Sequence, residues 1–322
     1  MMEITPRNIR TWSMLGQRGA AFTMALPEIA KERNDVMVLT ADLSLLSGLE
    51  RFKETYPDQF LDIGIAEQNM IGIAAGFAKE GNCVFASTYA TFITMRSFEQ
   101  IRNNLGVMGF NVKIIGFAAG VSMATSGNCH HSIEDIALMR VIPNMQVISP
   151  ADAMEAIKVM HAVSETKVPA YIRLTGNLNC PSVYKEDYNF EIGKGIVLHE
   201  GKDVAIIATG TMVAEAVKAC EKLKESGIDA TVVNMHTIKP LDEELILKLA
   251  QTHSRMITVE EHSVIGGLGG AVAECLAESE YSVKLTRMGF KDAYSRLGSY
   301  EYILNESNLN AEGIVAKIKE SI

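Results

Sequence analysis

Apolar and polar positions divide the chain into two alternating kinds of segment. One kind is a short run of apolar and β-branched residues, typical of a strand buried on both faces of a sheet. The other is longer and repeats its apolar residues at helical spacing. In the first half, the strand-like runs are 36–40, 112–117, 145–149 and 170–174, and the helix-like segments are 66–79, 132–140 and one opening at Ser149-Pro150-Ala151-Asp152.

The alternation is interrupted once and then resumes. Residues 175–195 are rich in Asn, Gly, Pro and Tyr, which is typical of a linker. Strand-like runs follow at 203–209, 230–234, 255–261 and 281–285, with helix-like segments near 211–226, 241–252 and 267–278. Strands that alternate with helices favour mainly parallel sheets flanked by helices. We therefore expect an α/β fold of two domains, 1–178 and 195–322, joined by a linker at 179–194.

Composition narrows the class of partner. The 322 residues include 30 basic and 39 acidic ones, a net charge of −9, and no Lys/Arg-rich run. This balance argues against nucleic acid or an anionic membrane and favours a small-molecule ligand. The five cysteines form no CxxC pair, so neither a disulfide framework nor a zinc cluster is indicated. Without a signal-peptide core or an 18-residue apolar span, we expect a cytoplasmic protein.

A glycine cluster at 266–270 invites a dinucleotide-binding interpretation. The G-x-G-x-x-G fingerprint is not completed, because Val272 occupies its last position counted from Gly267. Tight packing of a helix against a strand is the favoured interpretation.

Glu67 is an acid beside an otherwise apolar, small-residue segment. An acid at a helix start commonly complements the helix dipole. A buried acid, however, needs a partner that shares its proton or supplies a charge. The nearby segment 87–102 carries Phe92, Met95 and Phe98 at positions i, i+3 and i+6. These side chains could flank a planar ring, although an ordinary core face has the same spacing.

Two adjacent histidines, His130 and His131, stand in a Gly/Asn-containing loop before a helix-like segment. Adjacent residues of an extended loop point in different directions, which makes a poor metal pair. A role for His130 in proton transfer competes with the commoner solvated or structural role of a loop histidine.

Taken together and in order, these segments resemble the C-terminal half of the transketolase family, which comprises a pyrimidine-binding domain and a small C-terminal domain. The resemblance covers nearly the whole chain. The residues that carry it are Ala41-Asp42, Gly64 to Gln68, Thr91-Phe92 with Phe98, Gly127 to His130, Ile133-Glu134, Arg140, Pro143-Asn144, Ser149 to Asp152, Ile192 to Lys194, Lys239 to Asp242, and Val259 to Gly270.

The resemblance implies a thiamine diphosphate enzyme and gives Glu67 a task. In this family the matching acid hydrogen-bonds the N1′ nitrogen of the aminopyrimidine and activates the cofactor by proton exchange. Phe92 and Phe98 would border the pyrimidine, and Met95 takes a position where transketolases often have an aromatic residue. Asp42 matches an acid near the thiazolium.

The resemblance also suggests residues for the substrate. His130 matches a histidine near the reacting carbonyl and hydroxyls, and would relay protons. Arg18, Arg140 and Arg173 are candidates for a substrate phosphate, because a guanidinium fork suits that group.

Three positions depart from the family pattern. Ser126 stands where transketolases have an aspartate that reads a substrate hydroxyl, and Ala118 where they have a histidine facing the phosphate. The segment 173–176 lacks the second arginine of deoxyxylulose-phosphate synthases. Each replacement removes a charge-assisted contact of about 1.5–3 kcal/mol. We therefore expect the usual aldose phosphates to bind poorly.

A missing motif indicates a partner chain. Full-length members bind the diphosphate and its Mg²⁺ or Ca²⁺ through a Gly-Asp-Gly motif in a separate N-terminal domain, and the sequence has no Gly-Asp-Gly. We expect metal ligands from a partner, none from this chain, and an α2β2 assembly.

Three functions follow from the resemblance. The leading one is the C-terminal subunit of a split transketolase that moves a two-carbon ketol unit from a ketose or ketose phosphate to an aldose acceptor. The alternative is a pyruvate-decarboxylating acyl-transfer subunit of the 1-deoxyxylulose-5-phosphate synthase or 2-oxo acid dehydrogenase β type. A homologue that only binds a partner is the third.

Overall fold

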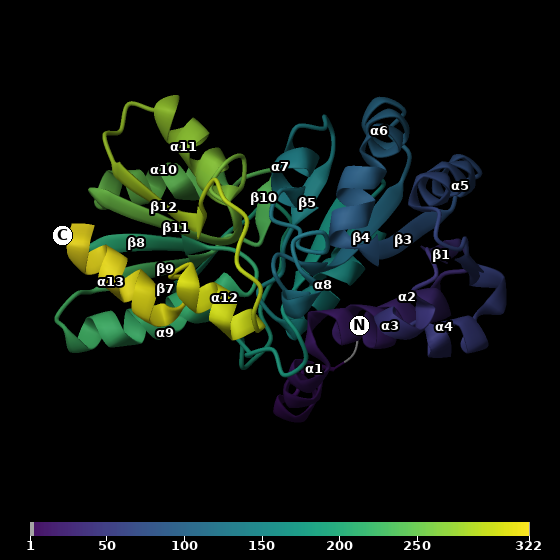
Figure 1. The fold of residues 1–322 in the computed structure, drawn as a ribbon, viewed down its shortest axis with the longest axis horizontal. Helices are drawn as coiled ribbons and strands as arrows, with labels where there is room; N and C mark the ends of the chain where they lie inside the picture. Colours follow the sequence, from purple (N-terminus) through teal and green to yellow (C-terminus); the bar gives the residue numbers. More distant parts are fainter. Residues whose placement is uncertain (1–2, 322) are drawn as a thin grey trace.

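The computed structural model describes residues 3–321 and contains two sheets that lie side by side (Figure 1). The first has seven strands in the order β10-β5-β6-β4-β3-β1-β2. Its pairs are parallel except that of β10 with β5. The strands are β1 Val36–Thr40, β2 Phe60–Asp62, β3 Cys83–Tyr89, β4 Val112–Ala119, β5 Gln146–Ile148, β6 Ala170–Thr175 and β10 Thr237–Lys239.

Helices cover both faces of this sheet, which explains the continuous apolar character of its strands. In β1, Val36 and Val38 belong to the apolar cluster that contains residues of helices α1, α2 and α8, whereas Met37 and Leu39 belong to the cluster that contains residues of α5 and α7. The helical elements are α1 Pro6–Gly19, η1 Ala20–Ala25, α2 Leu26–Glu32, α3 Ser44–Ser47, α4 Glu50–Thr55, η2 Pro57–Gln59, α5 Glu67–Lys79, η3 Phe92–Arg96, α6 Phe98–Ile101, η4 Arg102–Val107, η5 Ala124–Ser126, α7 Asp135–Arg140 and α8 Ala153–Ser164.

Helix α8 begins later than the sequence pattern suggests. Its N-cap is Asp152, whose Oδ1 accepts a hydrogen bond from the Glu155 amide at 2.8 Å. Ser149 and Pro150 lie before the helix. The acid is therefore the cap, which satisfies one of the amides that a helix start leaves without an intrahelical partner.

The second sheet has five strands in the order β12-β11-β8-β9-β7, and β7 alone among them runs antiparallel to its neighbour. Both sheets are thus mainly parallel and flanked by helices, as predicted. The elements are β7 Ile196–His199, β8 Val204–Ala208, α9 Met212–Glu225, β9 Ala230–Asn234, α10 Glu243–Thr252, β11 Arg255–Ser263, α11 Leu268–Ala277, β12 Lys284–Phe290, α12 Tyr300–Glu306 and α13 Ala311–Ser321.

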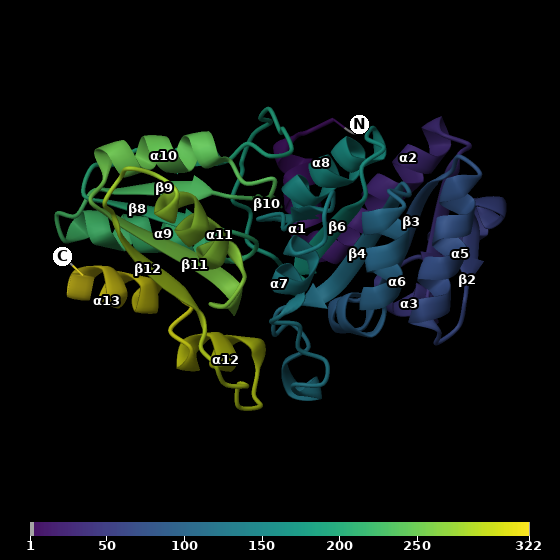
Figure 2. The ribbon, with the colours of Figure 1, turned by 90° about the horizontal axis from the view of Figure 1, so that it is seen from above.

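The connection between the sheets is irregular but firmly held. No helix or strand occurs between Thr175 and Ile196 in the described chain. The Val183 and Tyr184 amides donate to Asp152 Oδ2 at 2.8 and 3.1 Å. Farther along, β10 returns to pair with the first sheet and lies between the two halves (Figures 1 and 2). The proposed domain limits at 178 and 195 stay a prediction.

None of the helices between residues 3 and 321 has both the length and the apolar content needed to cross a membrane.

Candidate functional site

The carboxyl edge of the first sheet gathers the chemistry-bearing residues. Parallel strands end together there, and this edge is where open α/β sheets usually bind ligands. Three residues near it that are not glycine have a left-handed backbone: Asp42 (φ 57°), Ala118 (φ 54°) and Ala124 (φ 41°). Such conformations cost energy and cluster at functional sites, so this edge is the candidate active site.

Glu67 opens helix α5 at this edge, and its side chain is only 4% exposed. Its partner is Arg96, which was not anticipated from the sequence. Arg96 Nη1 donates to both Glu67 carboxylate oxygens at 2.9 Å. The same guanidinium lies over the Phe92 ring, with its carbon 4.4 Å from the ring centroid. The charge that a buried acid requires is therefore supplied within the chain.

The segment holding Phe92, Met95 and Phe98 is not a regular α-helix. Phe92 and Met95 lie in the π-helix η3, and Phe98 begins α6 after it. Phe92 is half-buried, Met95 is 37% exposed, and Phe98 packs against the hydrophobic core. A π-turn changes which residues share a face, and such turns are frequent at functional sites. Phe92 thus shares the Arg96 guanidinium with Glu67, whereas Phe98 packs against the core.

The two histidines have different surroundings. His130 is half-buried, and its ring centroid lies 5.4 Å from that of Phe92 and 5.9 Å from that of Tyr89. His131 is buried, with Nε2 2.9 Å from the Ala124 carbonyl and Nδ1 3.1 Å from Asn128 Oδ1. His131 therefore braces the loop, and His130 faces the candidate site. Among residues 3–321 no group of three metal-binding side chains comes together.

Asp42 stands at the tip of the turn that follows β1. It is exposed, and its amide donates to Asp62 Oδ1 at 2.9 Å. The Gly64 amide donates to the same oxygen at 3.0 Å. Asp62, which the sequence analysis did not single out, thus ties the Asp42 turn to the segment entering α5.

Comparison with known proteins identifies the family of this chain. The family model described as "Transketolase, pyrimidine binding domain" matches residues 17–180, and "Transketolase, C-terminal domain" matches residues 193–314. The chain belongs to the transketolase family.

Curated relatives extend this finding. A "Putative transketolase C-terminal section" of Methanocaldococcus jannaschii is 44% identical and covers 92% of this chain and 93% of its own. The "6-deoxy-6-sulfo-D-fructose transketolase subunit SqwH" of Clostridium sp. is 39% identical, with coverage of 92% and 91%. A solved structure titled "Split gene transketolase, inactive beta4 tetramer" is 42% identical, covers 95% of this chain and 97% of its own, and has a TM-score of 0.85. The relatives are transketolases, which are transferases.

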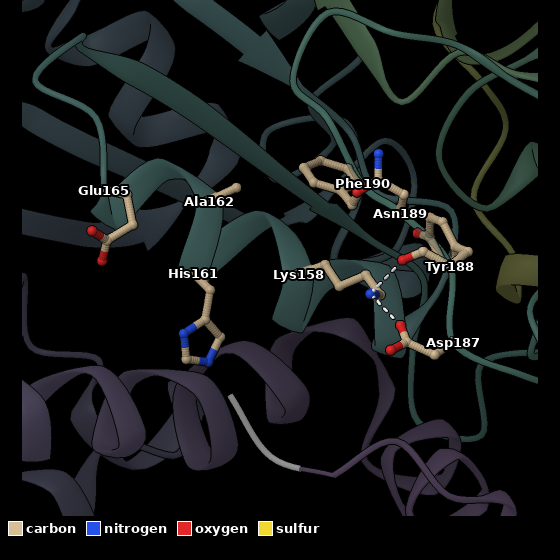
Figure 3. A pocket seen from close by; sticks show the side chains of 8 residues that line it. All are labelled: Lys158, His161, Ala162, Glu165, Asp187, Tyr188, Asn189 and Phe190. Carbon is tan, nitrogen blue, oxygen red and sulfur yellow. Dashed lines mark hydrogen bonds and ion pairs between the residues drawn. The ribbon is translucent and has the colours of Figure 1, made fainter.

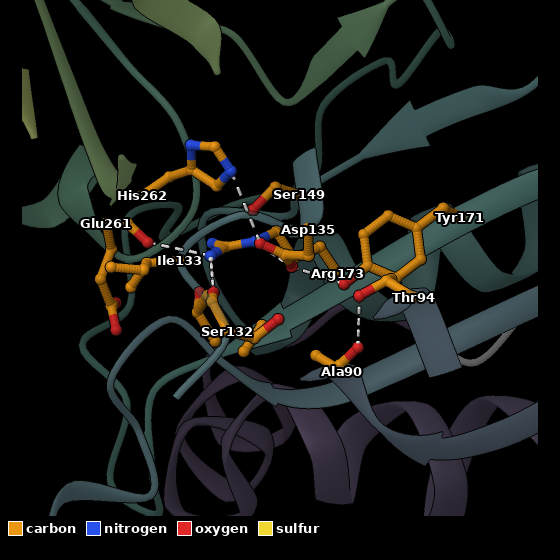
Figure 4. A network of polar contacts seen from close by, with 12 residues as sticks. Ala90, Thr94, Ser132, Ile133, Asp135, Ser149, Tyr171, Arg173, Glu261 and His262 are labelled. Atoms are coloured by element: carbon orange, nitrogen blue, oxygen red, sulfur yellow. Dashed lines mark hydrogen bonds and ion pairs between the residues drawn. The ribbon is translucent and has the colours of Figure 1, made fainter. Parts of the chain in front are cut away.

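Within this transketolase-family chain, two of the three arginines proposed for substrate are engaged elsewhere. Arg173, which is 1% exposed, donates from Nε to Asp135 Oδ2 at 2.7 Å and from Nη2 to the Ser132 and Glu261 carbonyls (Figure 4). Arg140 donates to the Gly266 carbonyl at 2.7 Å and pairs with Glu274 at 2.6 Å. Both guanidinium groups thus join the two halves of the chain. These contacts do not support binding of a phosphate by Arg140 or Arg173, and that role stays a prediction.

Arg18 remains a candidate for an anionic substrate group. It is half-buried, its guanidinium carbon lies 5.8 Å from the Phe117 ring centroid, and no carboxylate pairs with it within residues 3–321. Burial lowers the pKa of Arg18 from its ordinary value, and the Tyr89 phenol opposes this effect.

Ser126 is exposed and ends η5 just before Gly127, whose φ is 85°. It stays within the loop that carries His130.

Backbone amides of the segment with the glycine cluster donate hydrogen bonds to a carboxylate of the chain itself. Glu260 accepts hydrogen bonds from the Leu268 and Gly269 amides at 2.7 and 2.8 Å, at the start of α11. A Cβ at Gly267 would lie 1.9 Å from Glu260 Oε2. Burial raises the pKa of Glu260 to about 7, against the opposing effect of these two hydrogen bonds. This geometry favours the packing interpretation over a nucleotide site.

A hollow of about 670 Å³ lies away from the Glu67 edge, between α8 and the irregular connection (Figure 3). Its charged groups are already paired. Lys158 donates to Asp187 at 2.6 Å and to the Tyr188 carbonyl at 2.7 Å, and His161 Nε2 lies 3.1 Å from Glu28. The Glu67 edge therefore remains the candidate functional site.

Proposed function

We propose that this chain is the C-terminal subunit of a thiamine diphosphate-dependent transketolase that transfers a two-carbon ketol unit from a ketose, in free or phosphorylated form, to an aldose acceptor. The observation that carries the proposal is the arrangement of Glu67, Phe92 and His130. A buried carboxylate beside an aromatic face suits a planar ring that both stacks and hydrogen-bonds. One planar guanidinium group spans Glu67 and Phe92 in the structure, so the spacing between them fits such a ring.

The chain's own residues would orient the cofactor and handle protons. When bound, thiamine diphosphate supplies the stabilisation of carbanion character. Glu67 would hold a proton at the N1′ nitrogen, and Phe92 would fix the plane of the pyrimidine, with Met95 at its border. His130 would exchange a proton with the substrate's reacting oxygen, because it reaches the same edge from a different loop. Asp42 would lie toward the thiazolium end.

A separate N-terminal subunit would complete the site. The sequence has no Gly-Asp-Gly segment for the diphosphate and its Mg²⁺ or Ca²⁺. The surface around Asp42 and Glu67 also exposes large apolar side chains, including Leu45 and Ile65 at 77% each. Exposed apolar groups that cluster at a site mark protein interfaces. Both observations support active sites formed between subunits, and the assembly that we propose is an α2β2 tetramer in the cytoplasm.

An anionic ketose is the substrate class that the site suits. Arg18 is a half-buried cation without a carboxylate partner in the described chain, on the same edge as His130. One relative is named for 6-deoxy-6-sulfo-D-fructose, and another, from Phocaeicola vulgatus and 39% identical, is named for apulose-4-phosphate. Ser126 and Ala118 would set which anionic sugar is accepted, because neither supplies the charged contact of the usual pattern.

The test is thiamine diphosphate binding by calorimetry with Mg²⁺. The chain alone and a mixture with a Gly-Asp-Gly-bearing candidate partner would be compared. Binding only in the mixture is expected. Tight binding by the chain alone would contradict the split-site proposal.

A donor assay separates this function from the pyruvate-decarboxylating alternative. That alternative has support, since 1-deoxy-D-xylulose-5-phosphate synthases are 36–37% identical to this chain. The assembled complex is expected to turn over ketose donors without releasing carbon dioxide from pyruvate. Carbon dioxide release from pyruvate would favour the alternative.

A further inference from the structure

Arg96 occupies the two groups that the proposed function assigns to the pyrimidine ring. Its Nη1 donates to both oxygens of Glu67, and its guanidinium covers the face of Phe92 at 4.4 Å. A guanidinium is planar, stacks on aromatic faces and presents N–H groups along its edge. It therefore makes the same two kinds of contact that an aminopyrimidine would make.

We propose that the Arg96 guanidinium competes with the cofactor's pyrimidine for Glu67 and Phe92, and so acts as a latch on Glu67. This inference rests on the proposed function. The two uses of Glu67 exclude each other, because a carboxylate that accepts from a guanidinium with both oxygens cannot also hold a proton for a ring nitrogen. The stacking face of Phe92 likewise accommodates one planar group at a time. Cofactor binding must therefore displace the guanidinium.

The local structure allows the side chain of Arg96 to leave without unfolding the backbone. Gln68 Nε2 donates to the Arg96 carbonyl at 3.0 Å and ties η3 to the start of α5. The Arg96 side chain is 47% exposed, whereas that of Glu67 is 4% exposed. The guanidinium thus lies at the surface and can rotate into solvent, while the carboxylate and the ring stay in place.

The latch would set how tightly the assembled enzyme holds its cofactor. An ion pair with one half-exposed partner is modest in strength and weakens as salt increases. Displacing such a pair costs cofactor affinity without affecting the fold. Removal of the Arg96 guanidinium should therefore tighten thiamine diphosphate binding. Added salt should reduce the difference in affinity between a variant without this guanidinium and the wild type.

The test compares Arg96→Met with wild type in the complex with the N-terminal partner, by calorimetry of thiamine diphosphate with Mg²⁺. We expect binding about tenfold tighter in Arg96→Met, with the difference narrowing as sodium chloride is raised. Arg96→Lys should bind nearly as wild type does, because an ammonium still donates to Glu67. Arg102→Met is the matched control: Arg102 pairs with Glu99 on the next helical turns, at 3.0 Å, and should leave the affinity unchanged.

Equal or weaker binding by Arg96→Met, with Arg102→Met unchanged, would overturn the latch while leaving the proposed function standing. Absence of binding by the wild-type complex would instead remove the proposed function, and the latch with it. A gap between Arg96→Met and wild type that does not respond to salt would also contradict the latch, because a general structural effect of the substitution has no reason to be screened.

Discussion

Two carboxylate–arginine pairs in this chain are made from similar residues and have different consequences. Asp135 with Arg173 lies where the two halves of the chain meet, and Glu67 with Arg96 lies at the carboxyl edge of the first sheet. Both carboxylates are buried. The arginines differ, since Arg173 is 1% exposed and Arg96 is 47% exposed. Exposure of the cation distinguishes a fixed joint from a contact that a ligand can replace.

The number of hydrogen bonds sharpens the contrast. Arg173 also donates to the Ser132 and Glu261 carbonyls, and the Tyr171 hydroxyl donates to Asp135 at 2.6 Å. These bonds bring together β6, the loop before α7, and β11 (Figure 4). Arg96 uses one nitrogen on Glu67. The full burial of Arg173 and its hydrogen bonds to two backbone carbonyls mark this pair as a structural joint, although Asp135 Oδ1 has no hydrogen-bond partner within residues 3–321.

The largest expected effect is the loss of activity in Glu67→Gln. The amide keeps the shape and can still accept from Arg96, but it cannot exchange a proton. Turnover by the assembled complex should fall about 10³- to 10⁴-fold, at the upper end of what general acid–base catalysis contributes. The chain should fold normally, as measured by thermal unfolding. Turnover near the wild-type level would remove Glu67 from the mechanism.

Arg173→Met tests the Asp135–Arg173 joint. It should lower stability and leave turnover intact, the reverse of Glu67→Gln. The substitution leaves Asp135 buried without its cation, which typically costs about 3–5 kcal/mol of folding free energy. Urea unfolding should show this loss, and whatever folded complex remains at low temperature should retain its turnover. Arg173→Lys keeps a charge but loses the planar fork, and should recover part of the stability. A stable Arg173→Met protein that has lost substrate affinity would return Arg173 to the substrate site.

The sequence predicted the fold wherever strands are long and apolar. Residues 36–40 and 230–234 are strands with the expected limits, because both faces of each strand are buried. Strand β3, Cys83–Tyr89, was not predicted, since Ala86, Ser87 and Thr88 dilute its apolar pattern. Strand β10 has three residues and pairs with a sheet far away in sequence, so no local pattern could have indicated it.

For the site, the sequence identified Glu67, and the structure added its partner. Glu67 was conspicuous as an acid beside an apolar segment. Arg96 was not, because basic residues are common in helical segments and the pair spans 29 positions. Arg140 and Arg173 show the reverse case: they were predicted to bind a phosphate and are hydrogen-bonded between the two halves of the chain, since the sequence cannot tell a buried guanidinium from one that faces a ligand. Only tertiary contacts separate these cases.

Glu260, the buried carboxylate that accepts from the Leu268 and Gly269 amides, allows the effect of burial to be tested through pH. Burial raises its pKa in the folded chain to about 7 from an ordinary value of 4.5, so the folded state binds an extra proton between these values. Stability should therefore decrease as pH rises from about 4.5 to about 7, by at most about 3 kcal/mol, and then level off.

The measurement for Glu260 is urea unfolding of wild type and Glu260→Gln at pH 5 and pH 8. The difference between the proteins is needed because His262, whose pKa burial lowers to about 4, acts in the opposite direction: its contribution to stability is lost as pH falls from 6.5 toward 4. Wild type should lose more stability than the variant between pH 5 and pH 8. If the stability of the two proteins changed with pH in the same way, the raised pKa of Glu260 would not be the cause of the pH dependence.

The smallest expected effect comes from a third carboxylate–arginine pair, Glu99 with Arg102. Both side chains are exposed, at 60% and 48%, and lie three residues apart on neighbouring helical turns. Water and salt compete with such a contact, and ordering two long side chains offsets its attraction. Arg102→Met should therefore leave the melting temperature of the chain unchanged within measurement error, at low and at high salt. A clear loss of stability would mean that exposure of the arginine does not rank these pairs, and that Arg96 could be as firmly held as Arg173.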